Sequence, residues 1–512
     1  MRALSAAAAR AAPLGGLRNS SLRPAAAPRA ASSLQDHLSA IAIDGRGIAA
    51  VAVNVDSAEV ASKPFSRSQQ QHLHRLDRFL HSGRGASTRH EALIPTSSKM
   101  SSSNRDQRRC VATVTSSEAS AAKPQPIYAE NGSDGLSDDE EDEYKNVDAS
   151  GDTFELAEYQ LESGALLQDV TCRYRTYGRM NEDRSNVLVV CHALTGNAAL
   201  DEWWGSMLGP GKLFDDSKMF IVCMNVLGSC YGTTSPTSIN PKTGQPYGRS
   251  FPDVTVRDSV NLHLKLVREH LQASSIACVI GGSLGGMQTL EWAACGGDYV
   301  KAIMPMSCGA QHHPWQIAIS EAQRQAIYAD SDWCDGDYML HNTFPARGLS
   351  VARAMAMISY RTHAGYGRKF GRRQVHSRSA GNDQERFFEV ESYLRHQGTK
   401  FVSRFDALSY IKLTRMMDTH DLGRGREGGV EGVLQRMTQP ALVVSISSDA
   451  LYPPEEQFFI HDNLPNSELF IIDSDHGHDG FLLCQDEIVP VARTFLEKHV
   501  YSRLNEAPRA SL

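Results

Sequence analysis

From residue 154 onward, short apolar runs rich in β-branched residues recur along the chain, and each ends in glycine or another turn-forming residue. Continuous apolar runs of this length are typical of strands that are covered on both faces of a parallel sheet. Segments with a helical period lie between several of them, as in residues 257–272. The pattern therefore predicts an α/β fold with a doubly wound, mostly parallel sheet. The runs are residues 186–196, 219–228, 275–283, 301–309, 440–449 and 468–478.

One long interval, residues 310–439, breaks this alternation. It contains helical patterns, such as residues 315–330 and 349–363, and no further run of the parallel-strand type. Ligands of doubly wound folds bind at the carboxyl ends of the strands, so an insertion there can cover the site. We therefore expect a helical lid over this interval, between two parts of one core at residues 154–309 and 440–512.

The chain before this core has a different composition. Residues 1–35 contain five arginines and no acidic residue among Ala and Ser, which is typical of a transit peptide for a mitochondrion or plastid. An ordinary tail, with Met100 as a downstream start, would instead leave the protein cytoplasmic. Residues 36–153 are rich in Ser, Ala and charge, and the unbroken acidic run 138–143 predicts a solvated linker. We expect the folded structure to begin near Phe154.

Composition and charge narrow the class of partner. A net charge of −7 over 512 residues gives no reason to expect nucleic acid or an anionic membrane surface as a partner. The apolar runs are shorter than the roughly 18 residues that a membrane span needs. The ten cysteines form no Cys-x-x-Cys pair, which indicates free thiols rather than a disulfide framework or a zinc site. These features leave small-molecule substrates open.

One serine stands in a sequence context that predicts a nucleophile. Residues 281–285, Gly-Gly-Ser-Leu-Gly, match Gly-x-Ser-x-Gly between a predicted strand and a predicted helix. The glycines permit a strained turn that exposes the hydroxyl of Ser283, and the helix N-terminus favours developing negative charge. The alternative is a small residue in a structural turn.

A nucleophilic serine needs a base and an orienting carboxylate, which in this type of fold follow in the order Ser, Asp, His. Asp449 and His478 have that order, and each follows a predicted strand. The oxyanion requires backbone N–H donors, which we expect from Leu284 and from Ala193 or Leu194 in the loop "HALTG". We expect His192 in that loop to be a structural hydrogen-bonding residue. The competing histidine and acids are His476, Asp473, Asp475 and Asp479.

Motifs spread along the chain resemble the homoserine O-acetyltransferase family of α/β-hydrolase-fold acyltransferases. They include "HALTG", "NVLGSCYGTTSPTSINPKTGQPYG", "GGSLGGMQTLEWA", "DTHDLGRGR" and "GHDGFLL", and the match covers residues 154–500. The resemblance implies a ping-pong reaction in which Ser283 accepts an acyl group from acyl-CoA and homoserine then receives it, which gives an ester for methionine biosynthesis. It also implies that Arg353 and Asp479 hold the carboxylate and ammonium of the amino acid, with Tyr360 in the same pocket. Acetyl-CoA would be a co-substrate with no metal or tightly bound cofactor, and a homodimer is possible.

Three alternatives stay open at this point. A sister enzyme of the same architecture could acylate serine or use succinyl-CoA, because homoserine and serine differ by one methylene, worth about 1–3 kcal/mol. An esterase would have the same fold and triad and would release the acyl group to water. A non-catalytic binding protein of this fold is the third alternative.

Overall fold

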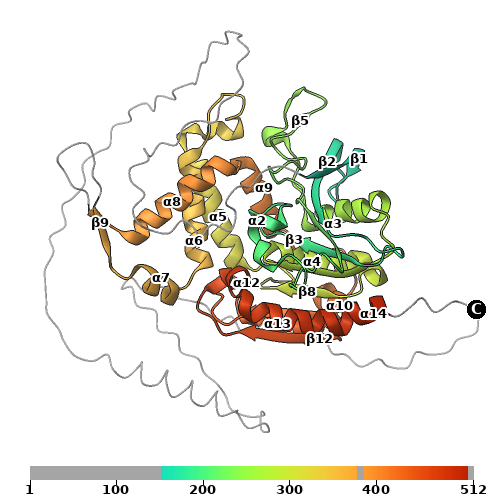
Figure 1. Ribbon diagram of the computed structural model, residues 1–512. Coiled ribbons are helices and arrows are strands. Elements are labelled where there is room, and N and C mark those ends of the chain that lie inside the picture. Colours follow the sequence, from blue (N-terminus) through green and yellow to red (C-terminus); the bar gives the residue numbers. More distant parts are fainter. Residues whose placement is uncertain (1–150, 377–385, 506–512) are drawn as a thin grey trace, which may run out of the picture. The chain divides into compact units, whose positions relative to one another are not determined.

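The computed structural model of the protein describes residues 151–376 and 386–505. A sheet of eight strands lies at its centre, in the order β1-β2-β4-β3-β7-β8-β11-β12 (Figure 1). The pairs from β4 to β12 are parallel, whereas β1–β2 and β2–β4 are antiparallel. All six predicted runs form strands of this sheet, so the predicted α/β fold is confirmed. The strands are β1 (Asp152–Gln160), β2 (Leu166–Tyr177), β3 (Val187–Cys191), β4 (Phe220–Met224), β7 (Ile276–Gly282), β8 (Ile303–Met306), β11 (Ala441–Ile446) and β12 (Ser467–Ile472).

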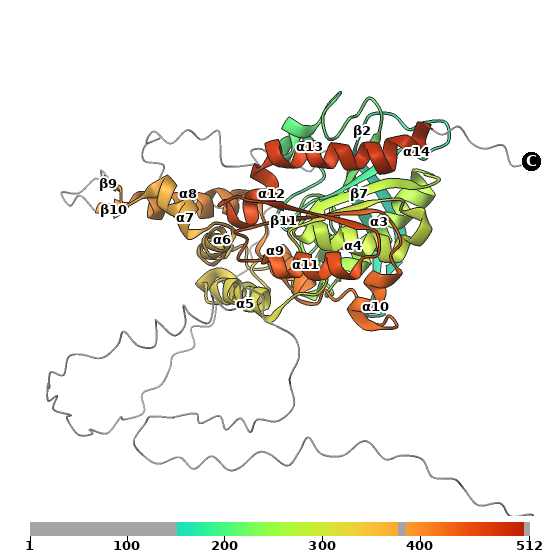
Figure 2. The same ribbon diagram turned by 90° about the horizontal axis from the view of Figure 1, so that it is seen from below.

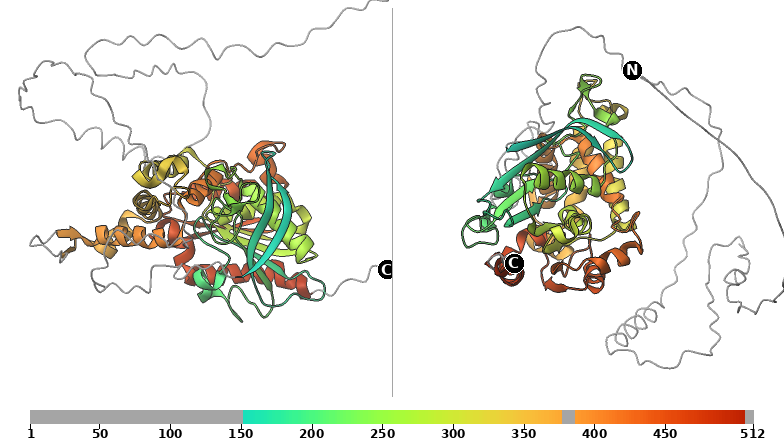
Figure 3. Two further views of the ribbon diagram at one scale, coloured as in Figure 1. Left: turned by 90° about the horizontal axis from the view of Figure 1, so that it is seen from above. Right: turned by 90° about the vertical axis from the view of Figure 1, so that its right-hand side faces the viewer.

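Two strands that the apolar runs did not predict, β1 and β2, form a long antiparallel pair at one edge of the sheet (Figure 3). Their buried residues are interspersed with exposed ones, because only one face of the pair packs on the core. Such strands lack the continuous apolar run that marks the other six. The register pairs Asp152 with Tyr174, so the fold begins two residues before the predicted start at Phe154. The predicted targeting segment and linker, up to residue 150, lie outside the described residues.

Helices cover both faces of the parallel strands (Figure 2). In β3, Val187 and Val189 belong to one cluster of buried side chains, and Leu188 and Val190 belong to another. Burial of each such side chain contributes about 1.5–3 kcal/mol, so both clusters stabilise the sheet. The first cluster includes residues of α3 (Val256–Lys265), α4 (Leu284–Gly296) and α11 (Pro454–Asn463), and the second includes residues of α2 (Leu200–Trp203) and α13 (Gln485–Leu496).

Between β8 and β11 the chain forms a group of helices that lies at one end of the sheet (Figure 1). Trp315 Nε1 donates to the carbonyl of Ala450, which follows β11, at 2.9 Å. Arg404 Nη1 donates to the carbonyl of Thr195, which follows β3, at 3.1 Å. These helices therefore lie over the carboxyl ends of the strands, where we expect a lid. They are α5 (Pro314–Tyr328), α6 (Ala346–Tyr360), α7 (His363–Phe370), α8 (Glu389–Arg404) and α9 (Ala407–Asp418), with the small antiparallel pair β9 (Gln374–His376) and β10 (Arg386–Phe388). The last helix of the interval, α10 (Gly429–Arg436), lies apart from them, beside α11 and before the amino end of β11 (Figure 2).

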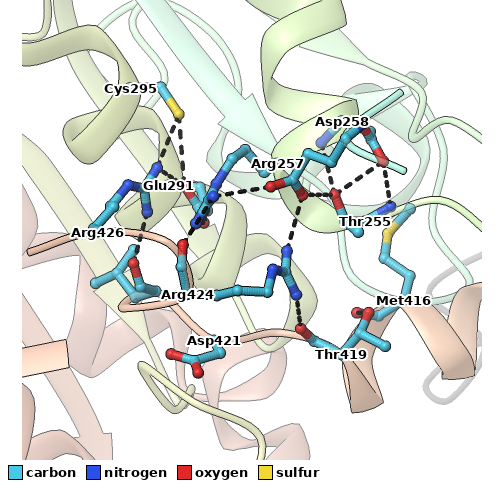
Figure 4. A network of polar contacts seen from close by, with 12 residues as sticks. Thr255, Arg257, Asp258, Glu291, Cys295, Met416, Thr419, Asp421, Arg424 and Arg426 are labelled. Carbon is cyan, nitrogen blue, oxygen red and sulfur yellow. Dashed lines mark hydrogen bonds and ion pairs between the residues drawn. The ribbon is translucent and has the colours of Figure 1, made fainter. Parts of the chain in front are cut away.

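The segment that leaves α9 is attached to the core by ion pairs. Arg426 Nη2 lies 2.6 Å from Glu291 Oε2 of α4 (Figure 4). Arg424 Nη2 lies 2.8 Å from Glu162 Oε2, and Arg257 of α3 pairs with both glutamates at 2.8 and 3.2 Å. We call these five residues the anchor cluster. The cluster gives the motif "DTHDLGRGR" a role in attaching the lid.

The sequence also led to expectations about the cysteines and about membrane-spanning helices. The nine cysteines among the described residues are free thiols, as predicted from their spacing. In the part of the chain that the structure describes, no helix combines the length and apolar character that crossing a bilayer requires.

Candidate active site

Ser283 lies at the turn between β7 and α4 in a backbone conformation that serine rarely adopts. Its φ is 58° and its ψ is −124°, a strained combination for a residue with a side chain. Such a residue costs of the order of 1–3 kcal/mol and is typical of functional sites. A Cβ on Gly285 would overlap the carbonyl of Cys191, and one on Gly281 would overlap the carbonyl of Gly285. These two glycines therefore let α4 approach β3 closely and hold the turn in place.

His478 and Asp449 form a buried hydrogen-bonded pair at the ends of two neighbouring strands. His478 lies in the short 3-10 helix η6 (Gly477–Asp479) after β12, and its Nδ1 is 2.8 Å from Asp449 Oδ2. The other oxygen of Asp449 accepts the backbone N–H groups of Leu451 and Tyr452, both at 2.9 Å. Because both oxygens of the ionised carboxylate only accept, Nδ1 carries the proton and Nε2 is left as the acceptor.

Phe481 links this pair to the serine turn. Its ring centroid lies 5.4 Å from that of His478, and a Cβ on Gly282, the residue before Ser283, would overlap the same ring. The three predicted catalytic residues thus converge at one corner of the sheet. The competing His476 is exposed, and Asp475 pairs with Arg368 of α7.

The loop after β3 lies beside the turn, as the expected source of an oxyanion donor requires. Its His192 is fully buried, and burial lowers the pKa of the imidazole to about 4, so the ring is neutral. His192 Nδ1 lies 2.8 Å from the carbonyl oxygen of Ala193, and its Nε2 accepts the N–H of Val226 at 3.0 Å. This is the structural role that we expected for His192. Leu284 is the first residue of α4, where backbone N–H groups have no partner inside the helix.

Two of the residues predicted to hold an amino acid, Arg353 and Tyr360, come from the lid helix α6, and the third, Asp479, follows His478. Arg353 of α6 is buried, and its guanidinium carbon lies 5.9 Å from the ring centroid of Tyr360. The ring of Tyr360 in turn lies 5.8 Å from that of His478, next to Asp479. Tyr360 therefore bridges Arg353 and the catalytic corner.

Two arginines at this site were missed by the sequence analysis. Arg361 Nε lies 2.7 Å from Asp479 Oδ2, so the predicted ammonium ligand already has a cationic partner from the lid. Arg404, at the end of α8, contacts the loop after β3 and Tyr231. Arg361 could have been found from its position directly after Tyr360. The local sequence around Arg404 gives no indication of a role at the site.

A third side chain near the acid of the pair was also missed. Glu456 of α11 is half-buried, and burial raises the pKa of its carboxyl to about 7. Its Oε1 accepts Nε2 of Gln316 at 2.6 Å, and the same amide donates to the carbonyl of Leu451 at 2.6 Å. Through Gln316, Glu456 therefore helps to hold the loop that contains Asp449. Over residues 151–376 and 386–505, no group of three or more His, Cys, Asp or Glu side chains is placed to hold a metal ion.

The chain is similar to proteins of known fold and named activity. A family model described as an alpha/beta hydrolase fold matches residues 186–483. A homoserine O-acetyltransferase from Chlorobium luteolum is 49% identical over 339 residues, which cover 66% of this chain and 92% of that protein. The similarity thus extends over nearly the whole of the relative.

Two solved structures share the architecture. A homoserine O-acetyltransferase from Staphylococcus aureus is 28% identical with a TM-score of 0.55, and the match covers 68% of this chain and 95% of that one. Esterase E22 is 27% identical with a TM-score of 0.61, over 67% of this chain and 99% of that one. A transferase and an esterase therefore share this fold, and residues around the serine must separate the two activities.

Proposed function

The chain belongs to the homoserine O-acetyltransferase family, and from this premise we propose that an acetyl group passes from acetyl-CoA to the hydroxyl oxygen of homoserine through an ester on Ser283. The observation that carries the proposal is the hydrogen bond of 2.8 Å between His478 Nδ1 and Asp449 Oδ2, at the same corner as a serine held at positive φ. This arrangement supplies a nucleophile, a base and an orienting carboxylate.

In the first half-reaction, Ser283 Oγ attacks the thioester carbonyl of acetyl-CoA, and Nε2 of His478 accepts the serine proton. The negative charge that forms on the carbonyl oxygen is stabilised by the backbone N–H groups of Leu284 and Leu194, our proposed oxyanion donors. The C–S bond then breaks, and the sulfur of coenzyme A leaves as a thiol with the proton from His478. The acetyl group remains as an ester on Ser283.

In the second half-reaction, homoserine replaces coenzyme A. Arg353 binds its carboxylate, because a guanidinium can donate two parallel hydrogen bonds to a carboxylate. Asp479, the residue after His478, accepts hydrogen bonds from the ammonium. The homoserine hydroxyl gives its proton to His478 and attacks the ester carbonyl, Ser283 leaves and regains the proton, and O-acetylhomoserine is released.

The decisive experiment traps the acetyl group. Labelled acetyl-CoA should place one acetyl group on Ser283 in the absence of homoserine, and homoserine should discharge it as O-acetylhomoserine. Ser283→Ala should remain unlabelled, and Ser283 labelling by acetyl-CoA but not succinyl-CoA supports the acetyl donor. A label that leaves faster with serine than with homoserine would contradict the proposed acceptor.

An esterase is the second candidate, and the similarity to esterase E22 is the observation behind it. The residues that distinguish the two activities are Arg353 and Asp479, since an esterase has no use for a zwitterion site. Arg353→Gln should leave acetylation of Ser283 intact and abolish discharge by homoserine. Hydrolysis of simple acetyl esters at the rate of transfer to homoserine would favour the esterase.

Location and assembly complete the proposal. The composition of residues 1–35 supports import into a mitochondrion or plastid, which a fusion of this segment to a fluorescent protein tests. Val351, Met355 and Ile358 form an exposed apolar stripe on α6, which supports a homodimer joined through the lid. Light scattering of the wild type and of Ile358→Lys tests that association.

A further inference from the structure

The carbonyl groups of the loop after β3 are held by specific donors. The carbonyl of Ala193 lies 2.8 Å from His192 Nδ1 and accepts the N–H of Gly196 at 3.0 Å. The carbonyl of Thr195 accepts Nη1 of Arg404, from the lid, at 3.1 Å. All of these acceptors lie within two residues of Leu194, a proposed oxyanion donor.

Because the peptide group is planar, the contacts of the Ala193 carbonyl also determine the direction of the Leu194 N–H. In a trans peptide the C=O of one residue and the N–H of the next point in opposite directions. The donors that hold the Ala193 carbonyl therefore turn the N–H of Leu194 to the other side. In the same way Arg404 holds the Thr195 carbonyl, and the opposite end of that peptide is the Gly196 N–H, which donates to Ala193.

The hydrogen bonds consequently form a series that begins in the lid. Arg404 donates to Thr195, the same peptide group donates through Gly196 to Ala193, and the next peptide group presents the N–H of Leu194. A charged donor at one end strengthens such bonds, and bonds in series polarise one another. The guanidinium of Arg404 therefore both orients and polarises this donor.

His192 secures the middle of the series. Its Nε2 accepts the N–H of Val226, so Nδ1 carries the proton and is the donor to Ala193. Burial lowers the pKa of this ring to about 4, so the neutral tautomer persists throughout the neutral range of pH. His192 thus supports the loop from the core, and Arg404 supports it from the lid.

The guanidinium of Arg404 contacts residues of the core and of the lid. Its Nη1 also donates to Tyr231 Oη at 2.7 Å, from the loop after β4. Its guanidinium carbon lies 5.0 Å from the ring centroid of Phe401, on the same lid helix. The guanidinium is therefore fixed when α8 is seated on the core.

We propose that Arg404 is a positioning residue that completes the oxyanion hole through Thr195, Gly196 and Ala193 when the lid is seated. The inference rests on the proposed function, because it takes Ser283 as the acylated residue and Leu194 as an oxyanion donor. It assigns Arg353 and Arg404 to different tasks. Arg353 contacts the acceptor and acts in the second half-reaction, whereas Arg404 acts in both, because each passes through an oxyanion.

The test compares three reactions of Arg404→Gln with those of the wild type. They are acetylation of Ser283 by acetyl-CoA, acetylation by p-nitrophenyl acetate, and discharge of the acetyl-enzyme by saturating homoserine. Loss of an oxyanion donor lowers rates by about 10²–10³, so misorientation of one should lower all three by about tenfold to a hundredfold. Binding of a trifluoromethyl ketone, which forms an oxyanion on the serine, should weaken by the same factor, while the KM for homoserine changes little.

Matched variants separate this role from a general loss of structure. Arg395→Gln removes an exposed guanidinium from the same helix and should leave all three rates unchanged. Arg404→Lys keeps a cationic donor and should recover part of the loss. Tyr231→Phe removes only the second support of Arg404 and should give a smaller, equally shared decrease.

Several results would overturn the inference. A loss confined to acetyl-CoA would make Arg404 a coenzyme contact, and a rise confined to the KM of homoserine would make it an acceptor contact. Unchanged rates and unchanged ketone binding in Arg404→Gln would remove the proposed role altogether. Failure of the wild type to form an acetyl-enzyme would overturn the proposed function itself. If both the wild type and Arg404→Gln form the acetyl-enzyme at the same rate, only this inference is overturned.

Discussion

Arginines join the lid to the rest of the molecule in two regions, and they are used differently in each. In the anchor cluster, Arg257, Arg424 and Arg426 face the carboxylates of Glu162 and Glu291 (Figure 4). These arginines and glutamates satisfy one another, and Glu291 is almost fully buried. Glu291 has two arginine partners, and the loss of either one weakens the pairing of a buried carboxylate, so the cluster acts mainly on stability.

At the carboxyl ends of the strands, the arginines have other kinds of neighbour. Arg353 lies over the rings of Tyr360 and Phe401, and Arg404 donates to a backbone carbonyl and a tyrosine hydroxyl. Two lid arginines pair with carboxylates there, Arg361 with Asp479 and Arg368 with Asp475. Aromatic rings, carbonyls and hydroxyls are neutral groups, so a guanidinium in contact with them can act on a substrate or on a peptide dipole. The two regions should therefore respond oppositely to substitution.

The largest expected effect separates activity from stability at the serine turn. Ser283→Gly should lower transferase activity by about 10⁴-fold or more, because the nucleophile is lost. The same change removes the strain of a side chain at a φ of 58°, so the protein should become more stable by about 1 kcal/mol. Transfer assays and urea unfolding measure the two effects. Equal or lower stability of Ser283→Gly would show that the turn is not strained.

The opposite pattern is expected in the anchor cluster. Arg426→Met removes the partner at 2.6 Å from Glu291, which keeps Arg257 at 3.2 Å, and should cost about 1.5–3 kcal/mol of unfolding free energy. The kcat/KM of the folded fraction should remain within about twofold of the wild type, because Glu291 lies eight residues, about 12 Å, along α4 from Ser283. Denaturant unfolding and activity at low temperature provide the measurements. A large fall in kcat with unchanged stability would contradict the division between the regions.

A smaller effect is expected when the ion pair between Arg361 and Asp479 is broken. Arg361→Gln leaves Asp479 without the cation at 2.7 Å that orients it, and the KM for homoserine should rise about tenfold. Acetylation of Ser283 in the absence of homoserine should be unaffected. The conservative change Arg361→Lys should restore part of the affinity. A fall in the acetylation rate would assign Arg361 to the first half-reaction instead.

The last test concerns the carboxyl group of Glu456. Its hydrogen-bond partner is the neutral amide of Gln316 and not a guanidinium. Burial raises the pKa of Glu456 from 4.5 to about 7, so the folded state binds its proton more tightly than the unfolded state does. The stability that this proton contributes is fully present below pH 4.5 and is lost as pH rises to about 7.

Glu456→Gln should therefore gain stability relative to the wild type across this window and keep the gain at higher pH. Thermal unfolding at pH 5 and pH 8 measures it, as a difference of roughly 2–4 °C for each kcal/mol. A difference between the two proteins that does not change with pH would contradict the assignment.

The extent of sequence-based prediction differs between parts of the molecule. The six strands of the parallel sheet were predictable because burial on both faces requires a continuous apolar run in each strand. The edge strands β1 and β2 were not predicted, because half-buried residues mixed with polar ones produce a weaker signal. The motif "DTHDLGRGR" was visible in the sequence, but its role in attaching the lid depends on Glu162 and Glu291, which come from distant parts of the chain.

By itself, the sequence determined the α/β class, the order of Ser283, Asp449 and His478 and the position of each one after a strand, because each of these depends on local pattern and spacing. The tertiary structure alone decided the pairing of Asp479 with Arg361 and the contact of Arg404 with Thr195. Hydrogen bonds and ion pairs such as these join residues far apart in the chain. Their geometry exists only after the lid has packed on the sheet, so no local stretch of residues contains it.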